Sequence, residues 1–492
     1  MPVDTQYAIS ETLFQENIEQ DHYRSLQFAK AWEAYEGRLP KPLKVEGAFD
    51  DNVRINPAQG VVDAGVSFLF GDEQGIQWTY QGDDPTNPEA APSWLTALRQ
   101  AWKANKQDTL LMGVGINGGV CGHVFIKLLP RGAGRDGSFP QLVNLDPGNV
   151  HVDWNPNDCT QAWRYTITYT TVDETAEPKR ALARQQVIDS VRDANDVIQS
   201  WTITTNEQDL TAGAQSPWLQ VGPTVKWDYR WPPIADCQNL VVPNQYWGMA
   251  DLEEPVVDVI SSLQFMLSNL NKIIRIHANP KTHAKGLTPD LVSEIQISPD
   301  GVIALPDPEA ELKNLEMHSD LSAAQGVYNG VRAAFDEMTQ TPEIVRGQTN
   351  AASSQLSGVN LSILFAPLLK RTAKKRRTYG DMLLELSLRI LELMSEDFME
   401  AENLLQIQWP DVMPGSAFLQ RQSLLVDKQL GASTDTLLAK LGYDPATEKG
   451  NNMADMESLG QLQANNVGTN MNRNPAGAGQ GLGTEGAATQ TS

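Results

Sequence analysis

The sequence predicts an α+β protein, with strand-rich segments in its first half and long helices in its second. Residues 123–233 hold several runs of β-branched and aromatic side chains separated by Gly, Pro, Asn and Asp, the composition typical of strands. From residue 249 apolar residues recur every three to four positions, as on one face of a helix. Residues 359–399 keep this period long enough for one helix of roughly 60 Å, at ~1.5 Å per residue.

Composition narrows the class of protein. A chain of 492 residues has room for about two to four domains. Its formal net charge of -23 argues against coating nucleic acid by bulk attraction, although it allows a weak or sliding contact. The cysteines, Cys121, Cys159 and Cys237, are far apart and form no CxxC pair, which favours buried thiols in a reducing compartment. We expect neither a signal peptide nor a membrane span, because polar residues interrupt the most apolar stretch, 255–274.

The N-terminal part should begin with helices. Residues 8–36 have helical periodicity that Gly37 ends. A second helix is expected over 56–71, with Asn56 as N-cap and Pro57 at its first position. A third is expected over 92–105, opening with Ser93 as cap. Strands then follow, and residues 50–245 together are predicted to form one mixed α+β domain. The predicted strands lie in the runs HVFIKLLP, PQLVNLDPGNVHVDW, AWRYTITYTTV, VIQSWTITT and PTVKWDYRWPP.

The second half alternates helices with irregular segments. The sequence first predicts a helix from 249 that ends at NPKTHAKGLTPD, and then a small α/β excursion over 291–317 with a strand at 301–305. A helix capped near Ser319 and Asp320 should follow, then a polar loop over 341–358 and the long helix, bent at Pro367. The chain should end with shorter helices at 416–430 and 433–442 and a disordered low-complexity tail.

Two short motifs suggest a ligand-binding site but lack the neighbouring elements or residues that such a site requires. GVGING at 113–118 matches the dinucleotide-binding glycine pattern, which requires a helix after it, whereas a strand follows here. We therefore interpret it as a glycine-rich lead into a strand. His151 and Asp153 in HVDW alternate onto one strand face, but no further metal ligand lies at a supporting spacing. No nucleophile elbow, P-loop or HExxH motif occurs, so we predict no enzyme and no cofactor.

The long helix carries an unusual cluster of positive charge. Six cationic residues lie within eight positions: Lys370, Arg371, Lys374, Lys375, Arg376 and Arg377. Lys370, Lys374 and Arg377 are spaced i, i+4, i+7 on one face, with Arg371 and Lys375 beside them. The cluster is either a solvated helix face, with KKRR imitating a nuclear-localisation sequence, or a contact for an anion. A phosphate backbone or an acidic neighbouring subunit would relieve its repulsion, and the sequence leaves that choice open.

The order of these elements resembles the portal proteins of tailed bacteriophages, over roughly residues 30–460. The resemblance rests on AYEGRLPKPL with RINPAQGVVDAGVSFLFG, on the segment 247–286 that begins WGMADLEEP, on TPEIVRGQTNAASSQLSGVNLSILFAPLLKR, and on IQWPDVMP with LGYDPATEKGNNM. The acidic, Gly/Pro-rich stretch around 71–93 and the uncharged polar loop depart from the family's pattern.

The resemblance implies a portal-like fold that assembles as a ring, usually of twelve subunits. The regions it implies are N-terminal helices at 1–49, an α/β wing at 50–245, a first stem helix at 246–278, a clip at 279–318, a second stem helix at 319–342, a tunnel loop at 343–357, a long kinked helix at 358–400, a helical crown at 401–460 and a disordered tail at 461–492. Such a ring is assembled in the host cytoplasm and occupies the unique portal vertex of the virion.

The resemblance also implies a function and partners. The ring would pass double-stranded DNA through its channel and have no catalytic activity, since the ATPase and nuclease belong to terminase. It would meet the terminase large subunit, the major capsid and scaffold proteins, and head-completion or tail adaptor proteins, but no membrane. The alternatives are a different ring or connector component of a virion, and a nucleotide-binding α/β enzyme with a helical appendage.

Three groups of site residues follow as expectations. The channel-facing tunnel loop would present Gln348, Asn350, Ser353, Ser354 and Gln355, with Arg346 just before it as a further candidate DNA contact, and the six-residue basic cluster would form a belt above it. A channel through which DNA slides should bind phosphates weakly, and an uncharged loop meets that requirement. By position in the clip, the interface with terminase or a connector would include Asp307, Glu309, Glu311, Lys313 and Glu316. The alternative interpretation of that acidic stretch is a solvated loop with no binding role.

Overall fold

The computed structural model divides the chain into two compact units, and every element below belongs to the first. The first unit comprises Met1–Asp83 with Ala91–Pro414, and the second comprises Asp84–Ala90 with Gly415–Ser492. The structure describes residues 22–45, 47, 49–71, 75–81, 91–130, 132, 139–175, 177, 179–211, 216–278, 282–285, 311–314, 321–342, 358–394 and 398–411, and single positions between 424 and 437. The predicted helices at 416–430 and 433–442 and the predicted tail therefore lie largely or wholly outside the described residues.

Helices near the N-terminus follow the sequence closely. Residues 22–35 are helical, and Gly37 adopts a positive φ of 68° just after them, as expected for a residue that ends a helix. Helix α2 spans Pro57–Phe70, and the Asn56 side chain accepts a hydrogen bond from the Gln59 backbone N–H, so this predicted N-cap is confirmed. Helix α3 spans Ser93–Ala104, but its N-cap is Pro92 and Ser93 is already helical. The prediction that Ser93 caps this helix was wrong.

Helix α4 spans Gln107–Cys121 and contains the whole GVGING segment. The prediction of a glycine-rich lead into a strand was therefore wrong, since the strand begins only at His123. The helix tolerates its glycines because they allow close packing: a Cβ on Gly115 would lie 3.0 Å from Val66 of α2, and one on Gly119 would lie 2.8 Å from Val62. Gly122 in the left-handed region ends the helix.

Two antiparallel sheets make up most of the β structure. A three-stranded sheet has the order β10-β2-β3, and a larger one has the order β4-β5-β6-β7-β8, with β9 also pairing with β7. Their bounds are β2 His123–Leu129, β3 Gln141–Leu145, β4 Val150–Asn155, β5 Asp158–Asp173, β6 Arg180–Arg192, β7 Ile198–Asp209, β8 Leu219–Gln220, β9 Val225–Trp227 and β10 Ile234–Gln238, with a 3-10 turn η2 at Pro147–Asn149. The sequence interpretation missed β6 and β10.

A third, two-stranded sheet joins segments far apart in the chain. Strand β1 (Gln77–Tyr80) pairs antiparallel with β13 (Leu405–Gln408), so that Trp78 lies opposite Ile407. The stretch around 71–93 was left unplaced in the sequence interpretation, and 401–460 was assigned to a helical crown. Neither strand was predicted, because the pairing partners are more than three hundred residues apart, beyond the reach of a local pattern.

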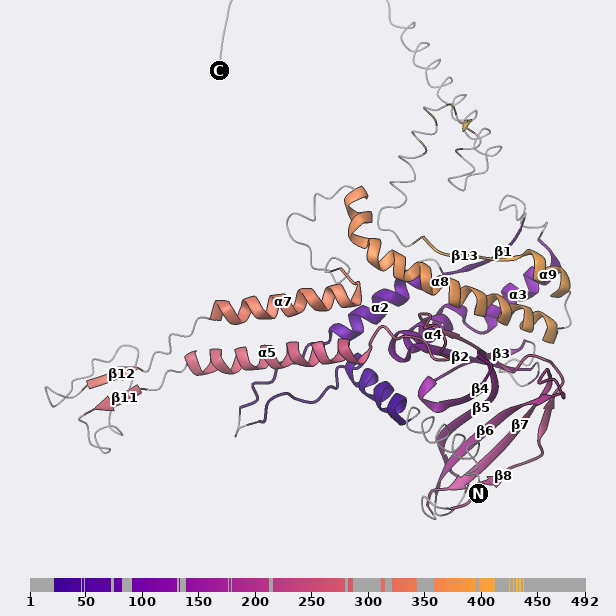
Figure 1. The fold of residues 1–492 in the computed structure, drawn as a ribbon, viewed down its shortest axis with the longest axis horizontal. Helices are drawn as coiled ribbons and strands as arrows, with labels where there is room; N and C mark the ends of the chain where they lie inside the picture. The colour runs from indigo at the N-terminus through magenta and orange to yellow at the C-terminus, as the bar shows by residue number, and fades with distance from the viewer. Residues whose placement is uncertain are drawn as a thin grey trace, which may run out of the picture. The chain divides into compact units, whose positions relative to one another are not determined.

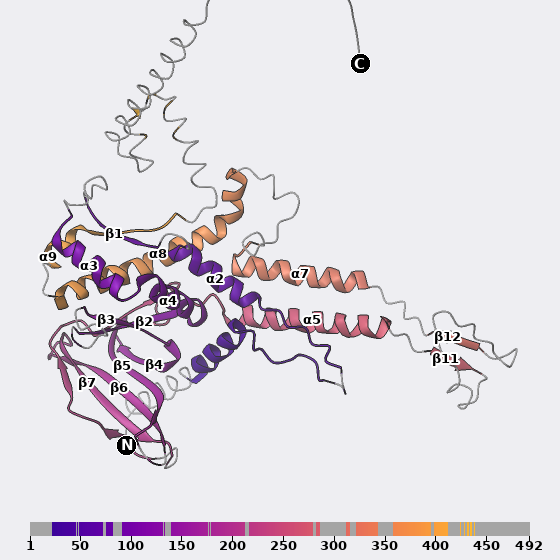
Figure 2. The same cartoon turned by 180° about the vertical axis from the view of Figure 1, so that it is seen from behind.

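Two helices form an antiparallel arm that leaves the body and returns (Figures 1 and 2). Helix α5 spans Glu254–Ala278 and packs against α7, Leu321–Thr339. Between them lie the paired strands β11 (Thr282–Lys285) and β12 (Glu311–Asn314). The prediction that the helix ends at NPKTHAKGLTPD is confirmed, since α5 ends at Ala278, but the strand at Thr282–Lys285 within that segment was not predicted. The predicted strand at 301–305 lies outside the described residues.

Helix α8 spans Gly358–Met394 and contains Pro367. A separate helix, α9, spans Phe398–Leu404, so the single long helix predicted to residue 399 ends earlier. The second half of α8 crosses the body (Figure 1), where Leu383, Leu386 and Ile390 are fully buried. This apolar face joins α8 to α2, α3 and β10 in the main core. A second core lies under the large sheet, around Tyr165, Ile188 and Trp201.

Candidate functional site

The six basic residues of α8 do not form one charged surface. Lys370, Lys374 and Arg377 are exposed, as their i, i+4, i+7 spacing predicts for one face of a helix. Arg371, Lys375 and Arg376 point into the body, and Lys375 is only 3% exposed. We call Arg371, Lys375 and Arg376 the internal cations. We call Lys370, Lys374 and Arg377 the exposed cations.

Asp251, which immediately precedes α5, is the acid that pairs with two of the internal cations. Its Oδ2 accepts a hydrogen bond from Lys375 Nζ at 2.6 Å, and its Oδ1 accepts one from Arg371 Nη2 at 2.9 Å. Burial acts to raise the pKa of Asp251, but the two adjacent cations outweigh it and hold that pKa below its ordinary value. Burial also lowers the pKa of Lys375, an effect that Asp251 offsets only in part.

This ionic cluster ties several helices together. Arg371 on α8 also donates to the Thr339 carbonyl at 3.3 Å, at the last residue of α7. The Asp251 backbone N–H donates to the Gly119 carbonyl of α4 at 2.7 Å. The cluster therefore fixes the beginning of α5, the end of α7 and the middle of α8 at one point.

Arg376, the third internal cation, is also used inside the chain. It donates to the Phe68 carbonyl at 3.1 Å and the Pro410 carbonyl at 2.9 Å, and its guanidinium lies 5.3 Å from the centre of the Trp409 ring. A basic belt made of all six residues is therefore wrong. The sequence interpretation allowed an acidic partner on an adjacent subunit, whereas Asp251 belongs to the same chain. Only the exposed cations remain candidates for an external anion.

The arm presents a face that the described part of the chain leaves uncovered. On α7 the outward residues are mostly small and include Ala323, Gly326, Gly330 and Ala334. A Cβ built on Gly326 or Gly330 would meet no atom within 4 Å. Large apolar side chains accompany them: Val327 on α7 is 58% exposed and Phe265 on α5 is 49% exposed.

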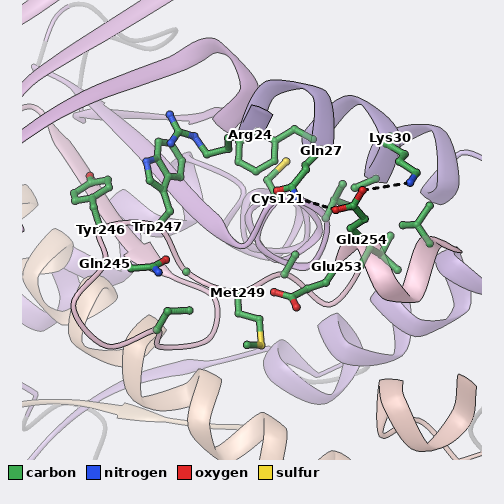
Figure 3. Close-up of a pocket in the computed structure, with 18 of the residues that line it drawn as sticks. Arg24, Gln27, Lys30, Cys121, Gln245, Tyr246, Trp247, Met249, Glu253 and Glu254 are labelled. Atoms are coloured by element: carbon green, nitrogen blue, oxygen red, sulfur yellow. Dashed lines mark hydrogen bonds and ion pairs between the residues drawn. The ribbon is translucent and has the colours of Figure 1, made fainter. Parts of the chain in front are cut away.

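A concavity of about 730 Å³ lies where helix 22–35 meets the segment leading into α5 (Figure 3). Its floor includes Cys121 at the end of α4. Arg24 stacks 4.0 Å from the centre of the Trp247 ring, and Lys30 lies 3.7 Å from Glu254 (Figure 3). Glu253 also lines the concavity, and partial burial raises its pKa. Because opposite charges already pair across it, the arrangement indicates helix packing more than a selective ligand site.

The buried carboxylate of Asp236 has neighbours of the kind found around catalytic groups, but its contacts hold parts of the fold together. Asp236 Oδ2 lies 3.0 Å from His123 Nε2, and its oxygens accept hydrogen bonds from the hydroxyls of Tyr165 at 2.8 Å and Tyr246 at 2.5 Å. Burial acts to raise the pKa of Asp236, but these partners outweigh it and lower that pKa. The network links β2, β5 and β10, so its geometry serves the packing of the two sheets.

The other predicted ligand residues show no cluster. His151 Nε2 lies 3.3 Å from Asp153 Oδ1 on the exposed face of β4. Among the described residues no group of three or more His, Cys, Asp or Glu side chains could hold a metal ion. Within the same residues, no helix combines the length and the apolar character that crossing a membrane requires.

Most of the predicted tunnel-loop and clip residues lie outside the described residues: Arg346, Gln348, Asn350, Ser353, Ser354, Gln355, Asp307, Glu309 and Glu316. Glu311 is exposed at the first position of β12, and Lys313 lies opposite His283 in the β11–β12 register. These two groups remain predictions.

Comparison with known proteins gives only a structural similarity. No family model matches the chain, and no curated protein matches it. A chain from the neck of an empty gene transfer agent (GTA) particle, computed with C6 symmetry, is similar at a TM-score of 0.47 and 12% identity, over 79% of this chain and 89% of that chain. A chain of the native GTA virion gives 0.43 and 12%, over 79% and 89%, and one from the native neck with C12 symmetry gives 0.45 and 11%, over 79% and 91%. At these values the similarity is distant.

Proposed function

We propose that the protein is a structural ring-forming subunit, the portal protein of a tailed-phage-like particle, through which double-stranded DNA passes. In this proposal it has no catalytic role. The arm of α5 and α7 is the stem, the β11–β12 segment belongs to the clip, and segment 343–357 is the tunnel loop. The subunit would meet terminase during packaging and connector proteins afterwards.

The uncovered face of the arm is the observation that carries the proposal. Each glycine inside a helix costs about 1 kcal/mol relative to alanine, so Gly326 and Gly330 weaken α7 in an isolated chain. Glycine and alanine on a helix surface permit another backbone to approach closely, and exposed Val327 and Phe265 would gain from being covered. Because every copy carries the same arm, a second copy is the simplest occupant, and repeated head-to-tail contact closes into a ring.

The charge distribution supports a channel that holds DNA weakly. Each phosphate that a protein neutralises strengthens a salt-dependent grip, so a sliding channel should offer few cations. The chain is acidic overall, and pairing inside the body withdraws Arg371, Lys375 and Arg376 from solvent. Lys370, Lys374 and Arg377 are left as a short row of exposed cations that could touch phosphates.

Electron microscopy of the purified full-length chain, with native mass spectrometry on the same sample, tests the proposal. We expect closed rings with a central opening and a mass near twelve subunits. A chain that stays monomeric at high concentration and also in the presence of a scaffold protein would contradict it. Tight binding of a nucleotide by such a monomer would instead favour the enzyme alternative.

A further inference from the structure

A small internal cavity lies beside the Asp251 cluster, between α2, the end of α7 and α8. Its volume is about 10 Å³, which is enough for one water-sized particle. Two cations, Arg371 and Lys375, line it together with Asp251. Three buried threonines complete the polar lining, Thr339, Thr341 and Thr372, and Val61 and Leu368 are among its apolar neighbours.

The charges around this cavity do not balance. Lys375 and Arg371 contribute two positive charges, and Asp251, which is 3% exposed, contributes one negative charge. The next acid along the chain, Glu253, interacts electrostatically with Arg371 and offsets part of this surplus, but it is exposed to solvent and lines a different concavity. Positive charge that is not fully compensated inside a protein is unfavourable, so the remaining surplus favours binding of an anion.

Lys375 and Arg371 also have N–H donors without an acceptor among the described residues. A lysine ammonium has three N–H donors, and among the described residues Lys375 Nζ has only Asp251 as acceptor. Arg371 Nε is buried and has no acceptor among the same residues. The hydroxyls of Thr339 and Thr372 donate to carbonyls four residues earlier in their helices, at 2.9 Å in both cases. Such a bond contributes little to stability, so a hydroxyl can turn toward a stronger acceptor.

We propose that this cavity binds a single small monovalent anion, of which chloride is the physiological example. The anion would accept hydrogen bonds from Lys375 Nζ and Arg371 Nε and would neutralise the surplus charge beside Asp251. The size of the cavity excludes polyatomic anions such as phosphate and sulfate. Water is the competing occupant: it would satisfy the donors but leave the charge uncompensated, unless Lys375 is deprotonated. The site does not depend on ring formation or on DNA.

Thermal unfolding of the full-length protein tests the site at fixed ionic strength, with sodium chloride exchanged for sodium gluconate. Gluconate is too large for the cavity. Chloride should raise the Tm saturably, by on the order of 2 °C. The Lys375→Met variant should lose this response, because the remaining Arg371–Asp251 pair is already neutral. Lys374→Met, which removes the adjacent exposed lysine, is the matched control and should keep the response.

Equal Tm values of the wild-type protein in the two salts would overturn the proposal, and so would a full chloride response in Lys375→Met. A second measurement decides the matter even if that variant fails to fold. In crystals of the wild-type protein soaked in bromide, an anomalous peak is expected beside Lys375 Nζ. A bromide-soaked crystal with no peak at that position would show that water fills the cavity.

Discussion

Helices α4 and α7 both contain several glycines, yet their glycines have opposite surroundings. In α4, a Cβ on Gly118 would collide with the Tyr379 hydroxyl of α8, and Gly115 and Gly119 lie against α2. In α7, a Cβ on Gly326 or Gly330 would meet nothing within 4 Å. Glycine costs both helices the same propensity, but only α4 gains close packing within the chain. The glycines of α4 are therefore used for packing inside the chain, whereas those of α7 have no such contact among the described residues, as an interface with a second copy would require.

Two consecutive lysines show the same division. Lys375 is buried and bound to Asp251, whereas Lys374 is exposed. Because adjacent residues on a helix lie about 100° apart, one segment can supply both an internal ion pair and an external charge. A substitution in the body should therefore damage the folded monomer, and one on the arm or the outer face should spare it.

The largest effect is expected at the centre of the body. Asp251→Ala leaves Arg371 and Lys375 buried with no carboxylate, which should cost about 4 kcal/mol in the free energy of unfolding. Denaturant unfolding followed by circular dichroism would measure it. Exposed Asp258 on α5 provides the control, since Asp258→Ala should change stability little. Equal losses in the two variants would show that the Asp251 cluster is not special.

Gly118→Ala should be the next most damaging change. The added methyl group has no room against Tyr379, so α4 and α8 must separate, at a cost of about 2–3 kcal/mol. Removing the obstacle in the double variant Gly118→Ala with Tyr379→Phe should restore part of the stability. A single variant as stable as the wild type would mean that α4 is not packed as closely as described.

The smallest effect concerns the exposed cations. If DNA phosphates touch Lys370, Lys374 and Arg377, replacing one of them by Gln should lower the slope of log K against log salt for DNA binding by at most about 1. Fluorescence anisotropy with a DNA duplex and the assembled protein would measure this slope. Lys375 cannot be used for the purpose, because its loss perturbs the interior. Unchanged slopes in all three variants would identify a merely solvated face.

Local patterns were sufficient for much of the helical structure. Asn56 and Pro57 predicted the beginning of α2, because capping and proline preferences act within a few residues. The apolar period predicted α5, α7 and α8 for a similar reason. Strand β6 was missed because Ala, Arg and Gln are common in helices, and its strand conformation comes from pairing with β5 and β7.

Less of the site than of the fold could be predicted from the sequence. Spacing correctly predicted that Lys370, Lys374 and Arg377 share a face, but it could not show that Asp251, more than a hundred residues away, binds the other face. One clue was present: Lys375 lies four residues before Tyr379 and seven after Leu368, so it belongs to the apolar stripe of α8. A lysine within an apolar stripe suggests a buried partner.

We propose that copies of the chain assemble through the exposed face of the arm, and substitutions at Gly330 provide the sharpest test of this assembly. Native mass spectrometry would compare the wild type with Gly330→Gln, which adds a bulky polar side chain where the single chain has open space. Gly330→Ala is the control, since it gains similar helix propensity with only one added methyl group. We predict rings for the wild type, weakened rings for Ala, and folded monomers at unreduced Tm for Gln. Wild-type and Gln proteins with the same oligomeric state would contradict the claim.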